Sequence, residues 1–250
     1  MEISKLKDFG IPPLREFLID GLIYKGEISL LYGESGAGKS ALIVDMFSRA
    51  VAGKTVDGRQ TVELDVFWLP TENLQEHQRR LLVTDKSIGG LSENKGIHYI
   101  AREYVKLVGD TAPSKMTSLA GKLRQEFSGR PQVVIIDTLN QAMPGMDENS
   151  SVGMSEVVSN LKILQEAIPE LHILIVHHSG KKKENGARGH SSLEAAMDSC
   201  FFLSKKDKTH QLEVTKQRGG NREGKIKFHL TPLQAKIEDR EFSSIGVEYL

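Results

Sequence analysis

A glycine-rich segment at residues 33–40 constrains this chain more than any other feature. It reads Gly-Glu-Ser-Gly-Ala-Gly-Lys-Ser and matches the pattern G-x-x-x-x-G-K-[ST] at every fixed position. A strand-like apolar run at 27–32 precedes it, and apolar residues at helical spacing follow it as far as Gly53. A strand, a glycine-rich turn and a helix in this order are typical of a loop that binds phosphate groups through its backbone N–H groups.

The positions of this loop predict separate contacts with a nucleoside triphosphate. Glycines let the backbone curl around the β-phosphate, and the helix that begins near Lys39 directs its positive N-terminus at the same anion. Lys39 is expected to contact the β- and γ-phosphates, and the Ser40 hydroxyl to ligate Mg²⁺. We therefore expect ATP and Mg²⁺ as cofactors. The expected ATP-binding residues are Gly33, Glu34, Ser35, Gly36, Ala37, Gly38, Lys39, Ser40 and Ala41.

Further apolar runs alternate with helical patterns along the chain. Strands are expected at 65–69, 97–101, 133–136 and 171–176, and helices at 73–83, 114–127 and 151–168. In the helix at 114–127 the buried face is expected to include Met116 and Phe127. Continuous apolar strands between helices predict a mainly parallel sheet flanked by helices on both faces, which is an α/β P-loop NTPase core. Short strands at 200–203, 212–215 and 226–230 predict an antiparallel C-terminal extension.

Composition excludes several classes of protein. The chain has 250 residues, and its 33 basic residues balance 33 acidic ones, which excludes a nucleic-acid binder held by bulk charge alone. A single cysteine, Cys200, excludes a disulfide scaffold and fits a reducing cytosol. No apolar run reaches the ~18 residues of a membrane helix, and residues 1–13 do not resemble a signal peptide. We expect a cytoplasmic protein without membrane contact.

Two acidic residues follow predicted buried strands. Asp137 ends the run at 133–136, where a carboxylate can hold Mg²⁺ through water, although Asp137 or Thr138 could instead cap a turn. Glu72 follows another such strand, and the carboxyl ends of parallel strands open onto the ligand crevice. Glu72 can therefore orient or deprotonate the attacking water. The alternative is that Glu72 or Asn73 caps the next helix.

Four further segments occur in a specific order. They are the lead-in at 21–33, the stretch at 67–81 that contains Glu72, the stretch R-G-H-S-S-L-E-A-A-M-D at 188–198, and the element K-Q-R at 216–218. Together they resemble the RecA-like ATPase core of ring-shaped replicative helicases of the DnaB and plasmid RepA kind. The resemblance covers about residues 15–232. It implies an N-terminal arm at 1–20, a RecA-like ATPase domain at 21–232, and a C-terminal tail of uncertain structure at 233–250.

The resemblance also implies an ATP site shared between subunits of a hexameric ring. Lys216 and Arg218 are two residues apart on a predicted strand, so their side chains leave the same face. By resemblance they contact the γ-phosphate bound by the next subunit, where such an arginine can raise hydrolysis by roughly 10³–10⁵-fold. A solvated basic face is the alternative. His178, rather than His177, is expected to sense the γ-phosphate; the alternative is one core histidine and one exposed histidine.

The segment at 179–190 supplies the candidate DNA contacts, which are Lys181, Lys182, Lys183 and Arg188. In a ring such basic loops would line the pore and hold a single strand without sequence choice. An ordinary solvated loop explains the lysines equally well, and Arg188 could instead contact nucleotide across an interface.

These features predict an ATP-hydrolysing, ring-forming replicative DNA helicase or translocase that acts on single-stranded DNA. A primase or an initiator protein is a candidate partner. Three alternatives stay open. They are a RecA-like recombination or regulatory ATPase without unwinding activity, a P-loop small-molecule kinase, and a non-catalytic nucleotide-gated binding module.

Overall fold

The computed structural model describes residues 5–8, 11, 14–89, 96–180, 186–220 and 224–250. Parallel strands are β3 (Ile28–Gly33), β4 (Asp65–Pro70), β5 (His98–Ile100), β6 (Gln132–Asp137), β7 (His172–His178) and β8 (Ser199–Lys206). Antiparallel strands are β9 (Thr209–Gln217), β10 (Lys225–Ile237) and β11 (Arg240–Tyr249). Together they form one sheet in the order β11-β10-β9-β8-β3-β7-β6-β4-β5. The predicted α/β fold with a mainly parallel sheet and an antiparallel C-terminal extension is confirmed.

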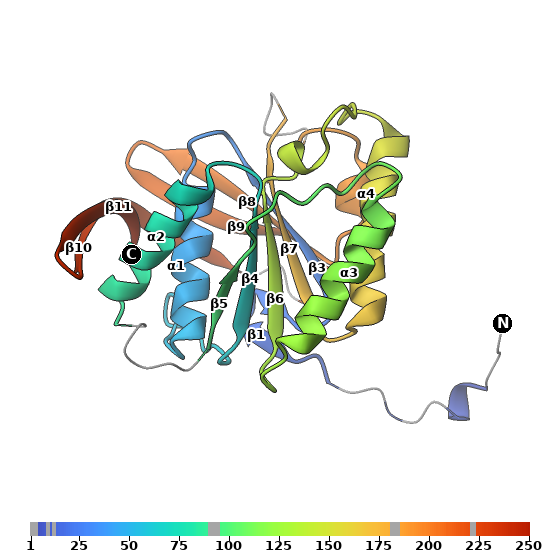
Figure 1. The fold of residues 1–250 in the computed structure, drawn as a ribbon, viewed down its shortest axis with the longest axis horizontal. Helices are drawn as coiled ribbons and strands as arrows, with labels where there is room; N and C mark the ends of the chain where they lie inside the picture. The colour runs from blue at the N-terminus through green and yellow to red at the C-terminus, as the bar shows by residue number, and fades with distance from the viewer. Residues whose placement is uncertain (1–4, 9–10, 12–13, 90–95, 181–185, 221–223) are drawn as a thin grey trace.

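Helices cover both faces of the parallel part of the sheet (Figure 1). One face carries α1 (Lys39–Val51) and α2 (Leu74–Ser87), and the other carries α3 (Ala112–Gln125) and α4 (Ser151–Ala167). A short helix, α5 (Ser192–Ala196), precedes β8. All residues of β3, β4 and β6 are buried, because parallel strands between two helical layers contact apolar side chains on both faces. No helix among the described residues has the length and apolar character needed to cross a membrane.

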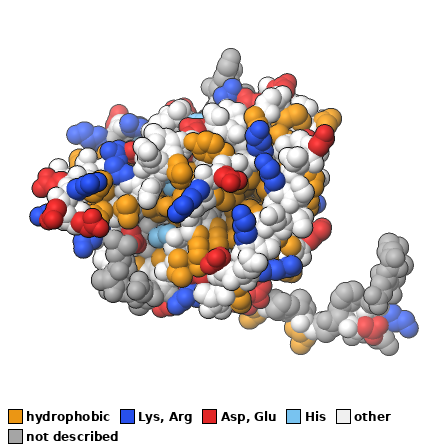
Figure 2. All heavy atoms as spheres, viewed as in Figure 1, with side chains coloured by type: hydrophobic (Ala, Val, Ile, Leu, Met, Phe, Trp, Pro, Cys, Tyr) orange, Lys and Arg blue, Asp and Glu red, His pale blue; other side chains and the backbone are white. Residues whose placement is uncertain are grey.

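An apolar groove lies between the edge strand β5, the segment that follows it, and α3. Figure 2 shows apolar side chains on this face with lysine and arginine around them. The groove has a volume of about 660 Å³, and its lining includes Tyr99, Met116 and Leu119, with Lys115 and Lys122 among its polar residues. The ring of Tyr99 stacks on Phe67 with the centroids 4.4 Å apart. An exposed edge of three residues is short enough to limit unwanted strand pairing.

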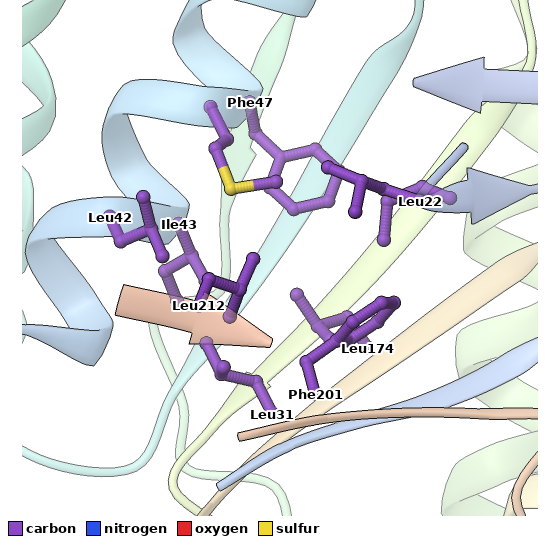
Figure 3. A pocket seen from close by; sticks show the side chains of 10 residues that line it. Leu22, Leu31, Leu42, Ile43, Phe47, Leu174, Phe201 and Leu212 are labelled. Carbon is purple, nitrogen blue, oxygen red and sulfur yellow. The ribbon is translucent and has the colours of Figure 1, made fainter. Parts of the chain in front are cut away.

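The core beneath α1 fixes the helix that follows the glycine-rich loop. Leu42 and Phe47 of α1 point toward Leu174 and Phe201 of the sheet, and Leu212 of β9 closes the cluster (Figure 3). The cavity among these side chains measures about 10 Å³. Such a volume does not exceed that of one water molecule, so this region is packed core and not a ligand site.

Residues at both ends of the chain join this core. The hairpin of β1 (Phe17–Ile19) and β2 (Ile23–Tyr24) buries Leu18 and Ile19 completely, so part of the expected arm at 1–20 packs against the domain. The boundary expected at residue 232 falls within β10, which pairs with β11 along 228–237. Tyr249 at the end of β11 donates a hydrogen bond to Asp45 of α1 at 2.5 Å. The C-terminal residues are therefore an ordered hairpin fastened to α1.

Candidate active site

Residues 33–40 connect the carboxyl end of β3 to the first turn of α1. Gly36 and Gly38 have φ angles of 74° and 91°, in the left-handed region that favours glycine. These conformations curl the chain so that backbone N–H groups of the loop and of the first turn of α1 converge. Convergent N–H groups at a helix N-terminus form an anion-binding site.

The ammonium group of Lys39 lies inside this loop. Its Nζ donates hydrogen bonds to the carbonyls of Gly33 and Glu34, both at 2.9 Å, and the residue is 6% exposed. Burial lowers the pKa of Lys39, while the nearby charge of Asp137 opposes the shift. A cation removed from water interacts more strongly with a phosphate than an exposed one, because less solvent screens the pair. The ammonium group of Lys39 therefore lies within the loop that is expected to bind phosphate.

Asp137 ends β6 and faces the first turn of α1. Its carboxylate lies near the Ser40 side chain. Burial raises the pKa of Asp137, while the Ser40 side chain and the charges of Arg80 and Lys39 oppose the shift. The described residues contain no group of three or more His, Cys, Asp or Glu that could hold a metal. One hydroxyl and one carboxylate are the donor set expected for Mg²⁺ that takes its other ligands from phosphates and water.

Glu72 is held beside Asp137 by bonds between the ends of β4 and β6. Thr71 N donates to Asp137 O at 2.8 Å, and Thr138 N donates to Thr71 Oγ1 at 2.7 Å. The Thr138 hydroxyl in turn donates to Glu72 Oε1 at 3.2 Å. Asn73 caps α2 by accepting a hydrogen bond from the Glu76 backbone, so Glu72 is not the cap of this helix. Glu72 is exposed.

The two adjacent histidines of β7 lie in different environments. His177 is fully buried, and its Nε2 donates to the Arg188 carbonyl at 2.9 Å. His178 pairs with Gly33 in the sheet and is half-buried. It lines a cavity of about 500 Å³ together with Glu34, Ser35, Asn140, Ser179, Gly180 and Arg188. Burial and then the charge of Lys39 lower the pKa of His178. Of the two, His178 is therefore the one beside the phosphate loop.

Arg188 lines the same cavity. Its backbone N donates to the His178 carbonyl at 2.9 Å, and its half-exposed side chain forms an ion pair with Glu148. Lys181, Lys182 and Lys183 lie outside the described residues. Of the four candidate DNA contacts, Arg188 is the one that the described residues include. It lies close to the phosphate loop, since it lines a cavity with Glu34 and Ser35.

Lys216 near the end of β9 and Arg218 directly after it reach the same acceptor, because both side chains donate to the Ala195 carbonyl. Lys216 Nζ donates to the carbonyls of Glu194 and Ala195 at 2.7 and 2.9 Å, at the C-terminal end of α5. Arg218 forms an ion pair with Asp198 at 3.2 Å. Both cations therefore have partners on their own chain, although the Arg218 side chain is 62% exposed.

The register of the sheet separates this pair from the phosphate loop. Cys200 pairs with Leu30 on one side and with Lys216 on the other. Lys216 is therefore level with Leu30 of β3. Leu30 lies three residues before Gly33, which places Lys216 about 10 Å from the end of β3 that leads into the phosphate loop. Arg218 lies further back, because its N donates to the Asp198 carbonyl and Asp198 itself bonds to the start of β3. Neither side chain contacts residues 33–40.

Arg80 is a site residue to which the sequence analysis assigned no role. It lies on α2 two turns after Glu72, and its charge opposes the rise that burial causes in the pKa of Asp137. The Nε atom of Arg80 is buried and has no hydrogen-bond partner among the described residues, while Nη2 bonds Glu76 at 3.5 Å. In the sequence, the one sign of this role is that Arg80 lies two helical turns after Glu72, on a helix that begins beside Glu72.

A phosphate loop between strand and helix, with a buried Asp137 at the end of a neighbouring strand, defines a P-loop NTPase. The chain matches the family model described as the AAA domain over residues 3–184 and therefore belongs to this ATPase family. The matched region contains Lys39, Glu72, Asp137 and His178 and ends before β8. No curated protein matches the chain.

Proposed function

We propose that this ATPase is a ring-forming, RecA-like replicative DNA helicase or translocase that acts on single-stranded DNA. The supporting observation is the position of Lys216 and Arg218. Lys216 lies near the end of β9 and Arg218 directly follows this strand, and the described bonds of both side chains go to residues 194–198 and not to the phosphate loop of their own chain. These two cations can contact a nucleotide that is bound by a neighbouring copy. To do so, Lys216 must release the carbonyls at the end of α5, and Arg218 must release Asp198. The proposal therefore requires a homo-oligomer, with a hexameric ring as the expected form.

Each side chain has a role in this proposal. Lys39 and the N–H groups of the loop hold the β- and γ-phosphates, and Glu72 orients and deprotonates the attacking water. Ser40 and Asp137 would hold Mg²⁺, which when bound neutralises phosphate charge. Arg218 and Lys216 of the adjacent copy stabilise the charge of the transferring phosphoryl group.

The path from nucleotide to DNA begins at His178. This residue lines the cavity beside the phosphate loop, and the loop at 179–190 follows it directly. Two backbone bonds close the base of that loop, one from Gly180 N to Gly186 O at 3.1 Å and one from Arg188 N to His178 O. If His178 moves when the γ-phosphate is lost, the two ends of the loop at 179–190 would move with it. Lys181, Lys182 and Lys183 would carry the shift to the DNA backbone.

Mixing two inactive variants tests the shared site. Glu72→Gln removes the group on the nucleotide-binding side, and Arg218→Ala removes the group on the opposite side. In an equal random mixture, about one interface in four between subunits combines an intact Glu72 with an intact Arg218. We expect ATP turnover to return at that level. A mixture of Lys39→Ala with Glu72→Gln is the matched control, because both changes fall on the same side and leave no interface intact.

Absence of rescue at every ratio would contradict the shared site. Sizing the protein with and without a non-hydrolysable ATP analogue then tests the ring, and a forked DNA tests strand separation. Hydrolysis without unwinding would favour a recombination or regulatory ATPase. Phosphate transfer from ATP to a small acceptor would favour a kinase.

A further inference from the structure

A histidine of the antiparallel extension contacts the phosphate loop directly. His210 of β9 is 2% exposed, and its Nδ1 lies 2.8 Å from the Ala37 carbonyl oxygen. The imidazole stacks on Phe228 of β10, with ring centroids 5.1 Å apart and an interplanar angle of 21°. These contacts hold the imidazole in one orientation against the loop.

The neighbouring glycine is enclosed by the same extension. A Cβ atom at Gly38 would lie 3.1 Å from the side chain of Leu230 and 3.5 Å from His210 Nδ1. Two consecutive residues of the loop therefore pack against β9 and β10. The loop is not an isolated turn between β3 and α1, since the strands at the other end of the chain form one wall of it.

The chemistry of the contact fixes the tautomer of His210. A carbonyl oxygen can only accept a hydrogen bond, so Nδ1 carries the proton and donates it. Burial lowers the pKa of His210, and the bond to Ala37 opposes this shift. The neutral ring with its proton on Nδ1 satisfies this contact without placing a second buried cation near Lys39.

The bond to Ala37 also orients the next N–H group. In a trans peptide the carbonyl and the following N–H point in opposite directions across one rigid plane. Because the Ala37 carbonyl points at His210, the N–H of Gly38 points away from β9. The N–H groups of such loops face the bound phosphate.

We propose that His210 is a positioning residue that fixes the Ala37–Gly38 peptide so that the Gly38 N–H faces the β-phosphate. The inference rests on the nucleotide binding assumed in the proposed function. It goes beyond that function by giving the antiparallel extension a part in the phosphate site of its own chain. Since Lys216 lies on the same strand as His210, β9 also links this loop to the face proposed to serve the neighbouring site.

Two substitutions separate the hydrogen bond from the ring stacking. His210→Phe keeps a ring against Phe228 and removes the donor, while His210→Asn keeps an N–H donor near the position of Nδ1 and removes the ring. We expect His210→Phe to weaken ADP and ATP binding about tenfold, the effect of losing one hydrogen bond that orients a charged contact. His210→Asn should stay within about twofold of the wild type. The control is His229→Ala on β10, where His229 Nε2 contacts Thr209 at 3.3 Å, away from the loop.

Dissociation constants from titration of a fluorescent ADP analogue, with thermal unfolding of each variant without nucleotide, provide the measurement. Wild-type affinity in His210→Phe, or equal losses in the Phe and Asn variants, would overturn the inference. A protein that gives the expected order of ADP affinities but unwinds no DNA would support it while contradicting the helicase.

A second measurement uses the wild-type protein and does not depend on the folding of any variant. Nitrogen-15 NMR of histidine-labelled protein should show the neutral His210 ring protonated at Nδ1. A neutral ring protonated at Nε2 would overturn the proposal, because that tautomer cannot donate to Ala37.

Discussion

The hydroxyl of Thr138 donates a hydrogen bond to the carboxylate of Glu72 at 3.2 Å, across the ends of β6 and β4. Thr138 is itself fixed by its backbone bond to Thr71 Oγ1 at 2.7 Å. The carboxylate is therefore oriented by two strand ends, although Glu72 is exposed. Orientation of this kind is what a general base needs to act on one water molecule.

Glu72→Gln should stop hydrolysis and leave ATP binding intact. The amide preserves size and hydrogen bonding but cannot take a proton, so we expect turnover to fall by about 10²–10⁴-fold. Phosphate release under single-turnover conditions and an ATP titration measure the two quantities separately. Glu103→Gln, a change of the same type in the groove beside β5, is the control. Unchanged phosphate release in Glu72→Gln would favour a non-catalytic nucleotide-gated module.

Lys39→Ala should abolish ATP binding or turnover. The buried ammonium is held inside the loop by two carbonyls, and no other lysine or arginine among the described residues donates to them. The ATP-dependent increase in the midpoint of thermal unfolding should disappear with the affinity. Lys115→Ala on α3 should keep that increase. Turnover at the wild-type rate in Lys39→Ala would refute the assignment of residues 33–40 as the phosphate site.

The sequence predicts the parallel half of the fold because its strands are buried on both faces. β3, β4 and β6 appear as largely apolar runs, and the residues that follow them lie at one edge of the sheet. Glu72 and Asp137 could therefore be placed in one crevice without any knowledge of side-chain contacts. Phe127 was wrongly placed on a buried face: α3 ends at Gln125, and Phe127 is 60% exposed. Periodicity alone does not fix where a helix ends.

The sequence predicts the antiparallel half of the sheet less completely. From Thr231 to Ile237, β10 alternates half-buried and exposed residues, and Pro232 argues against a strand. The structure accommodates Pro232 because β9 pairs only with 225–229, which leaves one side of β10 unpaired at this point. The contact of His210 with Ala37 joins residues 173 positions apart. Only the register of β9 brings them together, and no local pattern predicts it.

Stability should fall as the pH is lowered from 7 to 5. Burial lowers the pKa of His77, His98, His172 and His177 to about 4. Between pH 4 and about 6.5 the unfolded chain binds more protons than the folded one, so protons favour unfolding. Each such histidine contributes a slope of up to about 1.4 kcal/mol per pH unit.

Buried carboxyl groups act in the opposite direction, because burial raises the pKa of Glu27, Asp85 and Asp137. Burial raises the pKa of Asp85 to about 6, so its folded form gains protons first and offsets part of the loss below pH 6. Urea unfolding at pH 7, 6 and 5 measures the net effect. His172→Gln removes one buried histidine and should reduce the slope. A free energy of unfolding that is constant or rises toward pH 5 would contradict the prediction.

Charge reversal of Lys181, Lys182 and Lys183 to glutamate should weaken single-strand binding. If these lysines neutralise DNA phosphates, fewer counterions are released on binding, and the dependence of the affinity on salt becomes shallower. Binding of a fluorescent oligonucleotide at several salt concentrations gives both quantities. Charge reversal of Lys205, Lys206 and Lys208 at the β8–β9 turn is the control for a general loss of positive charge. If both triple charge reversals weaken binding equally, the proposal that the loop at 179–190 contacts DNA is contradicted.

Arg218→Ala should separate catalysis from stability. The Arg218 side chain is 62% exposed, and its ion pair with Asp198 spans 3.2 Å, so its loss should cost at most about 1 kcal/mol of unfolding free energy. ATP affinity should also persist, because Arg218 does not contact the loop of its own chain.

Turnover, in contrast, should fall by roughly 10³-fold or more if the guanidinium stabilises a phosphoryl group held by the neighbouring copy. The control is Lys225→Ala on β10, which removes an equally exposed ion pair with Glu213 at 3.6 Å. If Arg218 were only a surface charge, both variants would lose the same small amount of stability and neither would lose turnover. A loss of turnover confined to Arg218→Ala therefore distinguishes a cation acting between copies from one that merely pairs with Asp198.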